Sequence, residues 1–105
     1  MSEEPSTYYA EAKRDPVPYR YDLIPPECLA EIAKVFGQGA IKYGDYNYQN
    51  ERLVGHKSPI NHSMAHIMKY QMSTDAGARV EELSHAAVNL IIELFYELNR
   101  EKYDT

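Results

Sequence analysis

The pattern that most restricts the fold is a helical repeat of apolar residues between about Ala78 and Lys102. Apolar side chains recur there at intervals of three and four residues, which is the spacing of one face of an α-helix. The expected core face comprises Val80, Leu83, Ala87, Leu90, Ile91, Leu94 and Leu98. Such a face must be covered by other elements, and no segment of the chain has the period of two that is typical of a strand. The sequence therefore indicates an all-α protein.

A second helix is predicted from Pro26 to Tyr43, where Pro26 suits the first helical turn and Gly44 suits the end. Its expected apolar stripe contains Cys28, Leu29, Ile32, Val35, Phe36, Ala40 and Tyr43. Cys28 is therefore interpreted as a core residue and not as a nucleophile. We expect Gly37 and Gly39 to break or bend this helix, because glycine costs about 1 kcal/mol relative to alanine in a helix interior.

A third helix is predicted to begin at Ser58 and Pro59 and to end near Met72. Its expected apolar side contains Ile60, Met64, Ile67, Met68 and Met72, and its other side carries His62, His66 and Lys69. Three helices with short or medium connections predict a three-helix hairpin bundle. A chain of 105 residues forms only a modest core, so we expect oligomerisation, as a dimer or tetramer, to complete a four-helix type of packing.

The N-terminal segment and the composition indicate the domain organisation, the excluded partners and the compartment of the protein. Residues 1–21 contain three prolines and no helical period, so we expect an extended arm before a single domain at 22–105. A net charge of −5 argues against a protein that binds the backbone of nucleic acids. A single cysteine fits a reducing, cytoplasmic compartment, and no apolar run is long enough to cross a membrane.

The segment "GDYNYQNERLVGHK" at 44–57 is long for a loop and rich in Gly, Asn, Asp and Tyr, which favours a binding loop. Tyr43, Tyr46 and Tyr48 flank Asn47, and this combination suits stacking and edge recognition of a nucleobase. A tyrosine-rich packing loop, or a disordered surface loop, would have the same composition. The sequence of this segment fits a binding loop and both of these alternatives.

Polar residues interrupt the apolar helices in a way that suggests a site. Glu82, His85 and Asn89 lie on one side of the last helix, and the apolar residues around Asn89 predict that its amide is partly buried and paired. An acid and an imidazole three residues apart can present two ligands to one metal ion in a bundle. Glu27 and Glu31 lie one turn apart on the helix predicted at 26–43. Together with these two carboxylates, Glu82 and His85 could hold Mg²⁺ or Mn²⁺. Solvated helix faces explain the same spacing.

Cations are distributed so that some could reach phosphate groups. His62, His66 and Lys69 share one side of their helix, and further candidates at segment ends are Lys42, Lys57 and Arg79. Ordinary surface positions account for them equally well. The chain contains no Gly-rich phosphate loop ending in Lys-Ser/Thr, no serine elbow and no His-Asp pair of the metal-dependent phosphohydrolase type.

Three stretches together carry a family resemblance: "YDLIPPECLAEIAKVFGQGAIKYGDYNY", "NHSMAHIMKY" and "ELSHAAVNLIIEL". Over roughly residues 20–98 the chain resembles the phage-rich dATP/dGTP diphosphohydrolase N-terminal domain family, which is related to the MazG-like all-α NTP pyrophosphatases. The resemblance implies an all-α, oligomeric, divalent-metal enzyme. Such an enzyme would cleave a purine dNTP between its α and β phosphates, giving dNMP and pyrophosphate.

The positions that match the family are Lys42, Tyr43, Gly44 and Asn47 in the loop motif, His66 in the helix predicted at 58–72, and His85 and Asn89 in the helix predicted at 78–102. This chain departs from the family at Tyr48, where tryptophan is common, and at Glu82, where histidine is frequent. MazG relatives also carry a dense acidic cluster on the first helix followed by Glu-x-x-Asp on a later one. The nearest equivalents here are the sparser Glu27 and Glu31, and then Glu82 and His85.

The resulting hypothesis is a metal-dependent purine dNTP pyrophosphohydrolase of phage nucleotide metabolism. Its predicted catalytic residues are Glu31, Glu82 and His85, and its predicted Mg²⁺ or Mn²⁺ ligands are Glu27, Glu31, Glu82 and His85. The predicted substrate-binding residues are Lys42, Tyr43, Asn47, Tyr48, His66, Lys69 and Asn89. Two other classes fit the sequence: a non-catalytic nucleotide-binding or sequestration protein, and a helical assembly protein that uses its tyrosine-rich arm.

Overall fold

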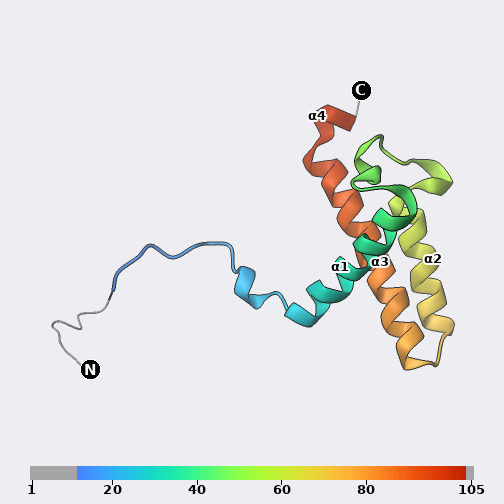
Figure 1. The fold of residues 1–105 in the computed structure, drawn as a ribbon, viewed down its shortest axis with the longest axis horizontal. Helices are drawn as coiled ribbons and strands as arrows, with labels where there is room; N and C mark the ends of the chain where they lie inside the picture. The colour runs from blue at the N-terminus through green and yellow to red at the C-terminus, as the bar shows by residue number, and fades with distance from the viewer. Residues whose placement is uncertain (1–11, 104–105) are drawn as a thin grey trace.

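The computed structural model describes residues 12–103. All regular elements in this range are helices and none is a strand, which confirms the all-α prediction. The α-helices are α1 (Pro26–Tyr43), α2 (Pro59–Met72), α3 (Ala76–Leu98) and the short α4 (Arg100–Tyr103). Single 3₁₀ turns form η1 (Tyr21–Leu23), η2 (Asn47–Gln49) and η3 (Gly55–Lys57). Helices α2 and α3 form an antiparallel hairpin, and α1 crosses α3 (Figure 1). Within the described range, none of the helices combines the length and apolar composition that crossing a membrane requires.

The helix ends follow the predicted capping signals. Ser58 accepts a hydrogen bond at 3.1 Å from the backbone N–H of Asn61, with Pro59 as the first residue of α2. Asp75 caps α3 in the same way, because its carboxylate accepts from the N–H of Ala78 at 2.8 Å. Gly44 ends α1 with a φ of 97°, a backbone conformation that favours glycine. The predicted starts of α1 and α2 and the end of α1 are confirmed.

Two predicted boundaries were wrong. Helix α1 continues through Gly37 and Gly39 without a break, because the cost of two glycines is small beside the packing of the buried Val35 and half-buried Phe36 on the same turns. The last helix does not continue to Lys102. It ends at Leu98, where the side chain of Asn99 donates to the carbonyl oxygen of Phe95 at 2.8 Å. The short helix α4 then begins at Arg100.

The best-buried large side chain, Tyr96, marks the centre of the packed region. Its hydroxyl donates to the carbonyl oxygen of Tyr48 at 2.7 Å, and burial raises its pKa, which keeps the donor protonated. Around it, the ring of Tyr48 lies 5.8 Å from that of Phe36 and 5.6 Å from that of Phe95. The end of α1, the following loop and the end of α3 therefore meet in one aromatic core.

The helix faces that the apolar pattern assigned to the core are exposed in the single chain, which corrects that prediction. On α2 they comprise Ile60, Met64, Ile67, Met68 and Met72, and on α3 Val80, Leu83, Leu90, Ile91, Leu94 and Leu98. Of the predicted stripe on α3, Ala87 is half-buried. The two helices instead contact each other through small side chains: Ser63 is buried, and its hydroxyl donates to the carbonyl oxygen of the buried Ala86 at 2.9 Å. Small residues permit this close approach, and the larger apolar side chains are left facing solvent.

The N-terminal part of the described chain extends away from the hairpin (Figure 1). Residues 12–20 have no regular structure and are exposed, and the rest of the predicted arm, residues 1–11, lies outside the described range. The first half of α1 also projects beyond the hairpin, so Leu29 and the free thiol of Cys28 are exposed. The prediction that Cys28 is a core residue was therefore wrong.

Candidate functional site

A histidine of α2 and a glutamate of α3 form a hydrogen bond across the hairpin. Nδ1 of His66 lies 2.7 Å from Oε1 of Glu82, and the two side chains are 21% and 25% exposed. The hydrogen bond from His66 lowers the pKa of Glu82, assisted by the positive charges of His66, Lys69 and His85 and opposed by desolvation. An ionised carboxylate only accepts hydrogen bonds, so Nδ1 of His66 must be the donor. Nε2, on the opposite side of the ring, is then directed away from Glu82.

His85 and Asn89 extend this polar contact along α3. The His85 ring stacks on that of His66 with a centroid distance of 4.9 Å and an interplanar angle of 24°. Asn89 is half-buried, as predicted, and its partner is the carbonyl oxygen of His85 in its own helix, at 2.9 Å. We call the group formed by His66, Glu82, His85 and Asn89 the polar seam. It combines an oriented imidazole, a carboxylate and partial access to solvent, which are the requirements for proton transfer to a bound ligand.

The local sequence explains why the seam lies between the helices. Ser63 and His66 are three residues apart on α2, and Glu82 and Ala86 are four apart on α3, so each polar residue shares a helix face with a small one. The contact between Ser63 and Ala86 therefore brings His66 to Glu82. The apolar pattern predicted an outer position for His66, because the methionine-rich side of α2 was expected to face the chain's own core. The small residues were the signal that it missed.

The predicted metal ligands do not form a complete set within one chain. Glu31, on α1, has its carboxylate 3.3 Å from Nζ of Lys34, and Glu27 lies exposed in the first turn of the same helix. Among residues 12–103 no group of three or more His, Cys, Asp or Glu side chains is placed to hold a metal ion. The residues of a single chain thus do not fit the predicted four-ligand centre, and metal dependence stays a prediction.

The remaining predicted substrate residues lie in three different environments. Lys42, Tyr43 and Asn47 are exposed near the end of α1, with Nζ of Lys42 5.1 Å from the centre of the Tyr43 ring. Lys69 is exposed close to Glu82. Tyr48 differs from both, because its ring packs between Phe36 and Phe95 and is thus a core element and not a stacking surface for a base.

The other three residues selected from the sequence as candidates to contact phosphate are Arg79, His62 and Lys57. Arg79 donates to the carbonyl oxygens of Tyr70 and Ser73 at 3.0 and 2.8 Å, and its guanidinium lies 4.0 Å from the Tyr70 ring centre. It therefore secures the connection between α2 and α3. His62 and Lys57 are exposed.

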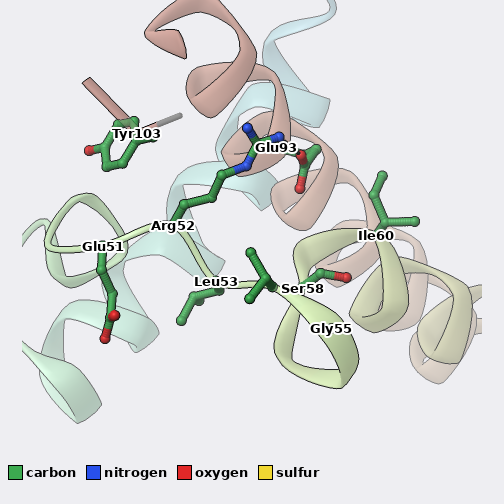
Figure 2. A pocket seen from close by; sticks show the side chains of 9 residues that line it. Glu51, Arg52, Leu53, Gly55, Ser58, Ile60, Glu93 and Tyr103 are labelled. Carbon is green, nitrogen blue, oxygen red and sulfur yellow. Dashed lines mark hydrogen bonds and ion pairs between the residues drawn. The ribbon is translucent and has the colours of Figure 1, made fainter. Parts of the chain in front are cut away.

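A surface pocket beside the loop at 44–58 contains an arginine that the sequence analysis did not select (Figure 2). Arg52 forms ion pairs with Glu93 at 2.6 Å and with Glu97 at 2.8 Å. Glu51 and Glu93 both line this pocket, so acidic groups outnumber the guanidinium around it. Such a pocket repels a triphosphate, and the polar seam is the better candidate for phosphate chemistry.

The lowered pKa of Glu82 predicts how stability responds to acid. Because the folded pKa lies below the ordinary value of 4.5, the contribution of Glu82 to the free energy of unfolding is complete above pH 4.5 and is lost as the pH falls through the folded pKa. The difference in unfolding free energy between the wild type and Glu82→Gln should therefore shrink as the pH falls below 4.5. Urea denaturation at a series of pH values measures it. The exposed neighbour provides the control Glu81→Gln, and the same profile there would contradict the assignment.

Comparison with known proteins gives one match. No curated protein and no solved structure matches the chain. The family model described as dATP/dGTP diphosphohydrolase, N-terminal, matches residues 9–105, which is nearly the whole chain. The chain therefore belongs to the dATP/dGTP diphosphohydrolase N-terminal family.

Proposed function

We propose that the protein hydrolyses a purine deoxynucleoside triphosphate, dATP or dGTP, to the monophosphate and pyrophosphate, in phage nucleotide metabolism. The observation that supports this most strongly is the His66–Glu82 pair: an imidazole held by an ionised carboxylate in a half-buried seam, in a chain whose family is named for this reaction. The proposed site is the polar seam, with the exposed Lys69 close to it.

In the proposed reaction the oxygen of a water molecule forms a bond to the α-phosphorus. The bond from that phosphorus to the oxygen bridging the α and β phosphates breaks, and pyrophosphate leaves with the electron pair. Nε2 of His66 accepts the proton of the water, while Glu82 holds the ring in the required tautomer and stabilises the imidazolium. Lys69, exposed and close enough to influence Glu82, offsets negative charge on the departing pyrophosphate.

A divalent cation, Mg²⁺ or Mn²⁺, is part of the proposal because polyphosphate substrates supply oxygen ligands to such ions. No step above depends on its position, since the predicted ligands of one chain do not come together. Activity should disappear when EDTA is added and return with excess Mg²⁺ or Mn²⁺.

The activity assay uses purified protein with each of the four dNTPs and Mg²⁺, and measures pyrophosphate and dNMP. We expect turnover of dATP or dGTP, and a fall in kcat of at least about 100-fold in Glu82→Gln, which loses the carboxylate that orients the base, and in His66→Asn, which loses the base itself. His62→Asn, at an exposed position on the same helix, is the matched control and should keep its activity.

Full activity in Glu82→Gln would contradict the proposed role of that residue. A non-catalytic nucleotide-binding protein is the second candidate, and the incomplete ligand set within one chain favours it. It predicts a thermal shift with dATP or dGTP and no release of pyrophosphate at any metal concentration.

We also propose that the protein is a homo-oligomer, in which a second copy covers the exposed apolar faces of α2 and α3. Six large apolar side chains on α3 alone, from Val80 to Leu98, are more than one-third exposed. A monomer rarely leaves a contiguous apolar surface of this kind uncovered, and a helix hairpin can bury it against a copy of itself.

Leu94→Glu should convert the oligomer to a monomer, because it places a charge in the middle of the apolar face of α3. Size-exclusion chromatography with light scattering measures the mass. Ile41→Glu makes the same change at a residue of α1 that is 90% exposed, outside both faces, and should leave the mass unaltered. A wild type with the mass of one chain would refute the proposed oligomer.

A further inference from the structure

The loop that connects α1 to α2 is attached to the end of α3 and to α4, although its composition is that of a free surface loop. The Tyr96 hydroxyl donates to the carbonyl oxygen of Tyr48 at 2.7 Å and lies 3.3 Å from that of Glu51. The Tyr103 hydroxyl donates to the carbonyl oxygen of Gln49 at 2.7 Å. These bonds satisfy backbone acceptors that no regular structure would pair, so the loop has a fixed base.

Arg52 adds the charged part of this attachment. Its Nη2 lies 2.6 Å from Oε2 of Glu93 and 2.8 Å from Oε2 of Glu97, and its guanidinium lies 5.5 Å from the centre of the Tyr96 ring. Arg52 and Glu93 are 19% and 18% exposed, so solvent screens this pair less than a surface pair. Figure 2 shows the Arg52 side chain directed from the loop toward Glu93. We call Arg52, Glu93 and Glu97 the arginine clamp.

The tip of the same loop faces solvent. Tyr46 has a φ of 60°, uncommon for a residue other than glycine, and its side chain is 69% exposed. The neighbouring Tyr43 is 62% exposed, and Asn47 is exposed as well. The exposed rings of Tyr46 in the anchored loop and of Tyr43 at the end of α1, with the Asn47 amide, can stack on a flat base and hydrogen-bond its edge.

The clamp connects this tip to the helix that carries the polar seam. Glu93 follows His85 by eight residues on α3, which corresponds to about 12 Å along a helix axis. The loop and the seam are thus held at a set separation by one continuous helix. A ligand that is contacted by both is bound with less ordering cost when the loop is already in place.

We infer that Arg52 is a positioning residue: it fixes the loop at 44–58 on α3 so that Tyr46 and Asn47 of the loop, next to Tyr43 at the end of α1, receive the base of the nucleotide whose phosphates lie at the polar seam. This inference rests on the proposed function and deepens it. Arg52 itself does not touch the triphosphate, since its guanidinium is bound by two carboxylates. Its effect is on the binding of the base and not on the chemical step.

The test compares the wild type with Arg52→Lys, which keeps the charge but loses the planar guanidinium that holds both carboxylates. Arg100→Lys is the matched control, because Arg100 approaches Glu97 only at 3.8 Å from a position 66% exposed. Without nucleotide, hydrogen exchange at the amides of residues 45–51 should become about tenfold faster in Arg52→Lys, with α2 unaffected. With dATP or dGTP, KM should rise about tenfold and kcat should stay within about twofold.

Unchanged exchange in Arg52→Lys, or equal changes in Arg100→Lys, would overturn the inference. So would faster exchange with an unchanged KM, since the loop would then be held but not used for binding. A wild-type chain that neither binds nor hydrolyses any dNTP would overturn the proposed function instead. The exchange measurements would then still decide whether Arg52 holds the loop.

Discussion

Ser63 of α2 is buried against α3 and donates its hydroxyl to the carbonyl oxygen of Ala86. This contact between small residues sets how each helix of the hairpin is rotated about its axis. With Ser63 and Ala86 inside, His66 meets Glu82, and His85 stacks on His66. The same rotation turns the leucines and methionines outward. One contact therefore accounts both for the candidate site and for the apolar surface that needs a partner.

A second packed region holds the remaining elements around Tyr96. Its ring is fully buried, and its hydroxyl secures the backbone of the loop between α1 and α2. Phe36 brings α1 into the same cluster through the ring of Tyr48. Helix α3 carries the seam in its first half and this cluster in its second. Helix α3 thus connects a group suited to proton transfer with a tyrosine-rich loop.

The sequence predicted the helices well, because the signals that begin and end them are local. Ser58 with Pro59, and Gly44, act through their own backbone conformation and need no knowledge of the rest of the chain. Apolar periodicity identifies which face of a helix is buried somewhere, but it does not say against which partner. For α2 and α3 it therefore indicated the wrong face for the intrachain contact.

The candidate site was predicted in part for the same reason. Glu82 and His85 were grouped by their spacing on one helix, a local relation that the structure retains. The pairing of Glu82 with His66 depends on how two helices are rotated, and Arg52 depends on a loop that folds back on α3. Neither relation leaves a periodic signal. The predicted set of Glu27, Glu31, Glu82 and His85 failed to assemble within one chain because α1 crosses α3 and its first half projects beyond the hairpin.

The binding of a purine dNTP at the polar seam can be measured directly through the four histidines of the chain. Imidazole resonances can be followed by NMR while dATP is added in the presence of Mg²⁺. We expect saturable shifts at His66 and His85, whose rings stack in the seam, and none at His56 and His62, which are exposed outside it. Shifts confined to His56 or His62, or saturable binding that leaves His66 and His85 unmoved, would contradict binding at the seam.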